Sequence, residues 1–186
     1  VEKINSTESR AVLHTALRAS ENQKILVNKK DIIPEIKSVK EKMKLFTASV
    51  LNGNYKGFKG DKITDVVNIG IGGSDLGPSM VVESLSHYKT DLNTYFISNV
   101  DGDHLNEVLS KVNPETTIFI IVSKTFTTIE TLTNANSVRS WFLKSASEND
   151  ISKHFIAVSS NVEKAIEYGI SSENIFPMWD LSLIHI

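Results

Sequence analysis

The amino-acid sequence predicts an α/β fold of three layers, with a doubly wound, mainly parallel sheet between helices and a helical N-terminal lead-in. After residue 62, four apolar, β-branched runs of strand length alternate with helix-like segments. Apolar residues are consecutive within each run, as in strands that are buried on both faces. Strands and helices that alternate in this way form right-handed βαβ units and therefore a parallel sheet.

The lead-in, residues 1–52, contains two expected helices, over 9–20 and 34–52. Pro34 suits a first helical turn, and the apolar residues that follow it recur at steps of three and four. A polar, glycine-rich segment, 52–62, connects the lead-in to the sheet. The expected strands and helices after it are, in order, 66–71, 77–88, 94–98, 102–112, 117–122, 128–145, 154–159 and 161–168.

The composition excludes several classes of function. The 186 residues carry a formal net charge of −2, so the chain has no basic excess. Binding to nucleic acid or to an anionic membrane is therefore not expected. The chain has no cysteine, which excludes disulfides and Cys-ligated metal centres. No apolar run is long enough for a membrane span and no signal-peptide pattern occurs, so we expect a cytoplasmic protein. A chain that opens on Val1 is expected to be a piece of a longer one.

The segment VVNIGIGGSDLGPSM, residues 66–80, leads from a strand into a glycine cluster, where ligands bind in doubly wound folds. A dinucleotide fingerprint would need a third glycine at Asp75, and a Walker A loop would need a lysine at Pro78. The amides of Gly73 and Ser74, with the Ser74 hydroxyl, remain able to bind a small anion or a sugar hydroxyl. A tight strand-to-helix turn explains the same glycines equally well.

A second loop, SKTFTT, follows the strand at 117–122 with a lysine among its hydroxyls: Ser123, Lys124, Thr125, Thr127 and Thr128. Thr127 and Glu130 have capping-box spacing, so a helix is expected to begin near Thr128. Hydroxyls and backbone amides then meet at a positive helix end, which forms a phosphate cradle. Helix capping alone would explain Thr127 but not the hydroxyls before it. Two such loops on successive βα units favour a sugar-phosphate site.

These two loops resemble the glucose-6-phosphate isomerase family, through NIGIGGSDLGP and SKTFTTIET. Further matching segments are TESRAVLH, SNVDGDH, NPETTIFI, KHFIAVS and IFPMWD, so the resemblance extends from about Ile4 to Asp180. It implies a fold with two α/β subdomains of the sugar-isomerase type. Residues 53–180 then correspond to an incomplete N-terminal subdomain behind the lead-in. The family's arginine-containing segment after Asp180 is replaced by LSLIHI, so 181–186 is expected to be a divergent tail.

The resemblance also implies an activity, the interconversion of glucose 6-phosphate and fructose 6-phosphate in glycolysis and gluconeogenesis, without a metal or organic cofactor. It gives Gly73 and Ser74 a role in substrate binding, and it places the sugar phosphate on Ser123, Lys124, Thr125, Thr127 and Thr128. The family's histidine, lysine and glutamate lie in segments beyond residue 186, so no catalytic residue is expected here and the chain alone should be inactive. Family members are homodimers.

Two other functions fit the same residues. One is a non-catalytic sugar-phosphate-binding module that serves regulation, and the other is an aminosugar-phosphate isomerase domain. The long match through the N-terminal helices favours glucose-6-phosphate isomerase over both.

Overall fold

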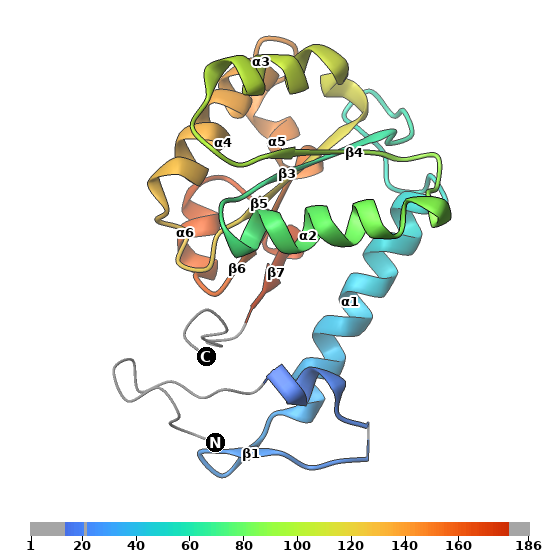
Figure 1. Ribbon diagram of the computed structural model, residues 1–186, viewed down its shortest axis with the longest axis vertical. Helices are drawn as coiled ribbons and strands as arrows, with labels where there is room; N and C mark the ends of the chain where they lie inside the picture. The colour runs from blue at the N-terminus through green and yellow to red at the C-terminus, as the bar shows by residue number, and fades with distance from the viewer. Residues whose placement is uncertain (1–13, 21, 179–186) are drawn as a thin grey trace. The chain divides into compact units, whose positions relative to one another are not determined.

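The computed structural model describes residues 14–20 and 22–178, and these form two compact units. The larger unit, Ser49–Pro177, is an α/β domain, and the smaller one consists of described residues before Ser49 together with Met178 (Figure 1). None of the helices in these described ranges is long and apolar enough to cross a membrane.

The smaller unit begins with a short 3-10 helix, η1 (His14–Arg18), and a hairpin of β1 (Leu26–Val27) and β2 (Lys30–Asp31). The hairpin turn, Asn28 and Lys29, has the two positive φ angles that suit a tight two-residue connection. Helix α1 (Ile33–Leu51) follows and confirms the predicted 34–52 helix. The expected 9–20 helix lies partly outside the described residues, and the described part is η1 alone. The hairpin was not predicted.

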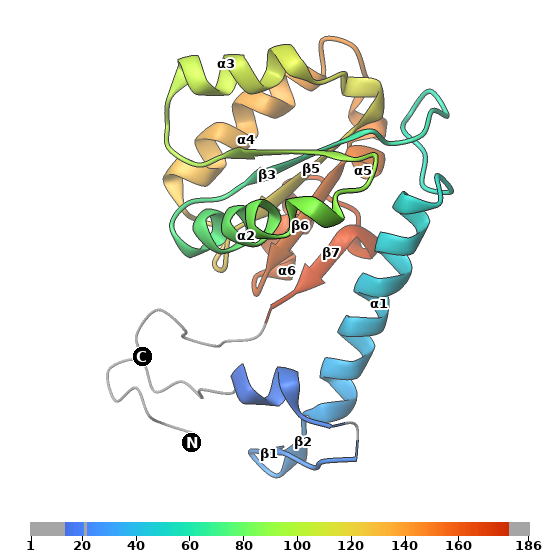
Figure 2. The ribbon, with the colours of Figure 1, turned by 45° about the vertical axis from the view of Figure 1, so that its right-hand side comes forward.

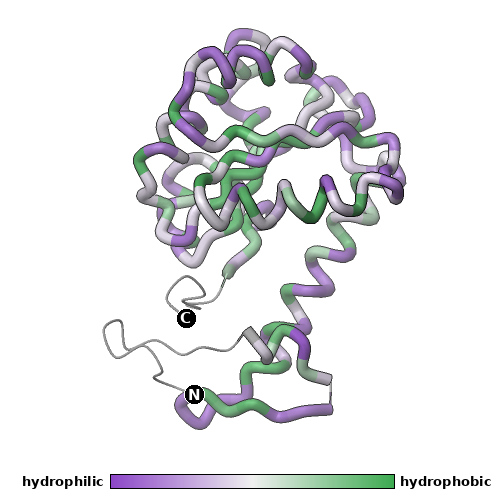
Figure 3. Tube along the Cα trace, in the orientation of Figure 1, coloured by the Kyte–Doolittle hydropathy of each residue, from purple (hydrophilic) through white to green (hydrophobic). Residues whose placement is uncertain are grey.

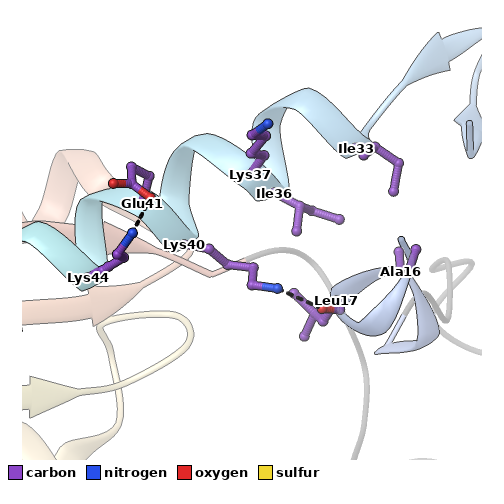
Figure 4. A pocket seen from close by; sticks show the side chains of 9 residues that line it. Ala16, Leu17, Ile33, Ile36, Lys37, Lys40, Glu41 and Lys44 are labelled. Carbon is purple, nitrogen blue, oxygen red and sulfur yellow. Dashed lines mark hydrogen bonds and ion pairs between the residues drawn. The ribbon is translucent and has the colours of Figure 1, made fainter. Parts of the chain in front are cut away.

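A pocket lies within this smaller unit, between η1 and α1 (Figure 4). Its apolar lining includes Ala16, Ile33 and Ile36, which are all buried. Three lysines and Glu41 also line it, and the Lys40 ammonium donates to the carbonyl of Leu17 at 3.4 Å. The pocket contains none of the predicted site residues, all of which belong to the α/β unit.

The α/β unit is built on a sheet of five parallel strands in the order β4-β3-β5-β6-β7. Its strands are β3 (Asp65–Ile69), β4 (Asn93–Ile97), β5 (Thr117–Val122), β6 (Phe155–Ser159) and β7 (Ile175–Pro177). The first four confirm the predicted strands to within about two residues, and all pair in parallel as predicted. Strand β7 was missed because three residues that end in proline carry little strand signal.

Helices connect these strands. The longer ones are α2 (Gly73–Ser84), α3 (Gly102–Lys111), α4 (Ile129–Phe142) and α6 (Val162–Glu167), and α5 (Ile151–His154) is a single turn. Short 3-10 turns lie between them: η2 (Ser86–Tyr88), η3 (Pro114–Thr116), η4 (Glu148–Asp150) and η5 (Ser172–Asn174). The Asp101 carboxylate accepts from the amides of Asp103 and His104, so it caps α3.

The strand order determines which face of the sheet each helix covers. The step from β3 to β4 runs one way along the sheet and every later step runs the other way, so right-handed crossovers place α2 opposite α3, α4 and α6. Figure 2 shows α3 and α4 on one side of the strands and α2 on the other. Val67, Phe119 and Ala157 point to the first side, where they form the main core with Val138, Phe142 and Ala165. The unit is therefore three-layered, as predicted.

Helix α2 begins earlier than the sequence predicted. The expected start near residue 77 is wrong, because Gly73 and Ser74 already form its first turn and Pro78 lies inside it. A proline there removes the amide that would bond the carbonyl of Ser74, four residues earlier. The side-chain amide of Asn68, on β3, donates to that carbonyl at 3.0 Å instead. The helix tolerates its internal proline because the sheet supplies the missing donor.

Candidate functional site

The two predicted loops meet at the carboxyl edge of the sheet. Strands β3 and β5 are neighbours with Ile69 opposite Ile121, so the glycine loop after β3 lies beside the threonine loop, Ser123–Thr128, after β5. The connections from these two strands leave in opposite directions, which makes this the switch point of the doubly wound sheet. Ligands of such folds bind in the crevice outside the strands at this point. The topology therefore places the predicted loops where a ligand is expected.

The glycines of the first loop differ in whether the backbone requires a glycine at their position. A Cβ atom on Gly70 would lie 2.9 Å from the Ser74 carbonyl oxygen and 3.1 Å from that of Val122, so close backbone approach requires glycine there. Gly72 has φ 61°, which other residues adopt only with strain. Gly73 has neither constraint, because no described atom lies within 4 Å of the position a Cβ would take. The space beside Gly73 is open to a ligand.

The threonine loop brings its hydroxyls together in two pairs. Ser123 is buried, and its hydroxyl donates to that of half-buried Thr128 at 3.3 Å. The hydroxyls of Thr125 and Thr127, both exposed, lie 2.6 Å apart. Lys124, which lies between Ser123 and Thr125 in the sequence, is half-buried. The structure therefore brings the predicted hydroxyl residues together in one loop.

The first turn of α4 follows this loop directly. Thr128 is its N-cap residue, but its side chain makes no capping hydrogen bond within the described chain. The predicted capping box of Thr127 and Glu130 is therefore wrong, since Thr127 lies one position too early and bonds Thr125 instead. An N-terminus without a side-chain cap presents backbone amides at the positive end of the helix dipole. That end of α4 can accept an anion.

A third loop, Ser159–Asn161 after β6, supports the threonine loop from the neighbouring strand. The carbonyl of Lys124 accepts the hydroxyls of Ser159 at 3.0 Å and Ser160 at 2.6 Å, and the amide of Ser160 at 2.9 Å. The side-chain amide of Asn161 donates to the carbonyl of Thr125 at 3.2 Å. This bracing role was not predicted, and the run of polar residues directly after the strand is its only signal in the sequence.

The fourth loop, after β4, is also tied to α4. The buried side-chain amide of Asn134 donates to the carbonyls of Ser98 at 3.2 Å and Asn99 at 3.0 Å. Sequence reasoning missed Asn134, a polar residue inside an otherwise ordinary helix. Across the described residues, no three His, Cys, Asp or Glu side chains gather in a group that could hold a metal ion.

Comparison with known proteins places these loops in a family. Residues 1–182 match the family model described as phosphoglucose isomerase. The chain belongs to the phosphoglucose isomerase family. A curated glucose-6-phosphate isomerase of Christiangramia forsetii is 58% identical over 179 residues, which cover 96% of this chain and 33% of that relative.

Solved structures agree with this assignment. A crystal structure of a glucose-6-phosphate isomerase from Chlamydia trachomatis is 30% identical, with a TM-score of 0.77 over 93% of this chain and 32% of that one. A hypothetical protein from Thermus thermophilus, 21% identical with a TM-score of 0.59 over 76% of this chain and 31% of that one, shares the fold. The chain thus spans about a third of the length of the phosphoglucose isomerase relatives that it matches.

Proposed function

We propose that this chain supplies the sugar-phosphate-binding half of a glucose-6-phosphate isomerase, which interconverts glucose 6-phosphate and fructose 6-phosphate in glycolysis and gluconeogenesis. The observation that supports this most directly is the adjacency of two loops at the switch point between β3 and β5. One loop carries clustered hydroxyls and the start of α4, and the other leaves open space beside Gly73. The similar proteins of Christiangramia forsetii and Chlamydia trachomatis are glucose-6-phosphate isomerases, which supports the same activity.

In this proposal the phosphate binds the threonine loop through Ser123, Lys124, Thr125, Thr127 and Thr128. Hydroxyls and helix-terminal amides donate to phosphate oxygens, and these charge-assisted bonds are stronger than neutral ones. Lys124 adds a positive charge to a loop that otherwise binds through neutral donors. The sugar then lies towards the glycine loop, where Gly73 leaves room and the Ser74 hydroxyl is within reach of a sugar hydroxyl.

The role of this chain in the reaction is to bind and orient the substrate. Proton transfer between the two carbons that exchange the carbonyl group needs a base and a stabilised oxyanion. We assign those groups to other segments of the full-length enzyme, which we expect to be a cytoplasmic homodimer. A non-catalytic sugar-phosphate-binding module would use the same two loops, and turnover by the full-length protein distinguishes it from an isomerase.

Replacing two of the threonines tests the phosphate site. In the full-length enzyme, Thr125→Ala combined with Thr128→Ala should raise KM for fructose 6-phosphate at least about tenfold, because a hydrogen bond to a charged group contributes about 1.5–3 kcal/mol. The matched control is Thr133→Ala, an exposed threonine further along α4, which should leave KM unchanged. An unchanged KM in the double variant would contradict the assignment of the phosphate to this loop.

A second arm of the same experiment tests the sugar position. Gly73→Ala should raise KM because the added methyl group enters the space assigned to the sugar, while the fold meets no clash. Gly77→Ala is the control, since its Cβ would also meet no described atom within 4 Å and it lies one turn further along α2. Equal KM values for the two variants would remove Gly73 from the site.

A further inference from the structure

Phe126, in the middle of the threonine loop, has an unusual backbone. Its φ is 52°, in the left-handed region, and this conformation costs a residue other than glycine about 1–2 kcal/mol. The two other described non-glycine residues with positive φ, Asn28 and Lys29, form a hairpin turn that requires this conformation. No such turn explains Phe126, so another interaction must hold it there.

The Phe126 side chain supplies that interaction. It is only 3% exposed, although its neighbours Thr125 and Thr127 are exposed. Its ring meets that of Tyr168, which follows α6, edge to face with centroids 5.7 Å apart. The guanidinium of Arg139, on α4, lies 5.9 Å from the centroid of the same tyrosine ring. We call these three side chains, Phe126, Tyr168 and Arg139, the aromatic anchor.

The backbone held by the anchor determines where the hydroxyls lie. In an extended strand, residues two apart share a face but are separated by about 6–7 Å. Here the chain turns at Phe126, whose amide donates to the carbonyl of Ser123 at 3.3 Å, and the Thr125 and Thr127 hydroxyls come within 2.6 Å of each other. The serine and asparagine bonds from the loop after β6 hold only the Lys124 and Thr125 carbonyls. The Ser123 amide donates to the carbonyl of Val158 at 3.1 Å, and the anchor holds the loop at Phe126.

We propose that Phe126 is a positioning residue for the substrate phosphate, acting through the backbone it fixes between Thr125 and Thr127. The proposal rests on the proposed function, since it assumes that this loop binds the phosphate. The Phe126 ring is buried against Tyr168, while the hydroxyls assigned to the phosphate belong to its exposed neighbours, Thr125 and Thr127. It keeps the loop in a conformation that the backbone alone disfavours.

Variants on both sides of the ring contact test the proposal in the full-length enzyme. Phe126→Ala should raise KM for fructose 6-phosphate at least about fivefold and weaken competitive inhibition by inorganic phosphate in parallel. The value of kcat should change much less, because phosphate binding is common to the ground state and the transition state. Tyr168→Leu should shift the same two constants in the same direction. Phe126→Leu, which keeps a large apolar side chain at this buried position, should restore most of the affinity.

The control separates positioning from a general loss of packing. Phe142→Leu alters an equally buried aromatic residue of the same core, whose ring contacts are Phe58, Phe119, Phe155 and His154 rather than the loop. It should lower stability without changing KM or phosphate inhibition. If Phe142→Leu raises KM as much as Phe126→Ala does, the effect is general and the positioning role is overturned.

The remaining outcomes distinguish this inference from the proposed function. If the double threonine variant raises KM while Phe126→Ala and Tyr168→Leu do not, the loop binds phosphate but the anchor does not position it. If the threonine variant has no effect, the phosphate site itself is wrong. Should Phe126→Ala fail to accumulate, Tyr168→Leu still decides the question, since a normal KM in that variant overturns the anchor.

Discussion

The two faces of the sheet differ in how well they are packed. On the face covered by α3, α4 and α6, strand and helix residues are buried together, including Phe119, Val138 and Phe142 at 0% exposure. On the other face α2 has no buried residue, and its Leu76 and Met80 are 67% and 63% exposed. Figure 3 shows hydrophobic stretches along both the central strands and α2. Apolar residues are present on both faces. Ile118 and Ile156, which point to the face of α2, are only 1% exposed, but α2 itself has no buried residue, whereas α3, α4 and α6 each have at least one.

The continuous apolar run of β5 illustrates the difference. Phe119 and Ile121 point to the packed face and are fully buried. On the other face Ile118 is also buried, but Ile120 and Val122, nearer the carboxyl end of the strand, are only partly buried. Such a run predicts a strand covered on both faces. A continuous apolar run therefore indicates that both faces of a strand are suited to burial. Residues on a face are buried only where other elements cover that face.

The largest expected effect comes from truncating a side chain on the packed face. Phe142→Ala should lower the free energy of unfolding of the 186-residue chain by about 3–5 kcal/mol, because it leaves a cavity among closely packed rings. Met80→Ala on α2 should change it by less than about 0.5 kcal/mol. Urea denaturation monitored by circular dichroism measures both. Similar losses for the two variants would show that α2 is as well packed as α4.

A smaller effect is expected from adding one methyl group to Gly57, which lies against η3 and α5. A Cβ on Gly57 would lie 1.9 Å from the Glu115 carbonyl oxygen and 3.1 Å from Cε1 of His154. Gly57→Ala should therefore destabilise the chain by about 1–3 kcal/mol, as overpacking does. Gly77→Ala on α2 meets open space and should be neutral or stabilising by up to about 1 kcal/mol. Thermal denaturation of both variants would reveal whether the contrast holds.

The smallest expected effect concerns pH. Buried His154 accepts the amide of Phe58 on Nε2 at 2.9 Å, so Nδ1 carries the proton and donates to the Thr117 carbonyl at 2.6 Å. Burial lowers the pKa of His154 from its ordinary value of 6.5, against the bond to Thr117 and the nearby Asp150 carboxylate, while Lys153 adds to the lowering. A proton on Nε2 would also break the bond from Phe58.

Because its pKa is lower in the folded state, His154 contributes stability that is present above pH 6.5 and is lost as the pH falls through the folded value. The free energy of unfolding should therefore decrease as the pH falls below about 6.5. His154→Gln should be less stable at neutral pH and should lack the part of this slope that is due to His154. A slope of equal size in the variant would assign it to other groups.

Much of the fold could be predicted because its signals are local. The strand at Thr117–Val122 and the cap at Asp101 follow from apolar runs and from the capping chemistry of aspartate. The early start of α2 could not be predicted, because glycines and an internal proline are poor helix formers. What stabilises that turn is Asn68, which lies on a strand and acts through tertiary structure.

The candidate site also has residues that the sequence indicated and residues that it did not. Hydroxyls and glycines after strands indicated the two loops, and their adjacency follows once the strand order is known. The residues that hold the loops in place gave no such signal. Phe126 and Tyr168 are distant in sequence and meet only in the folded core, and Asn134 is an ordinary helix residue until it reaches the loop after β4. Contacts of this kind depend on the fold and not on a motif.

Because of the bond between Asn68 and the Ser74 carbonyl, the residue tolerated at position 68 depends on the residue at position 78, and the reverse. The proline at 78 can be kept only while residue 68 offers a donor, and the donor is needed only while residue 78 lacks one. A substitution at either position changes what selection allows at the other. Among relatives we therefore expect Pro78 and Asn68 to be inherited together, with loss of the proline freeing the strand residue to vary.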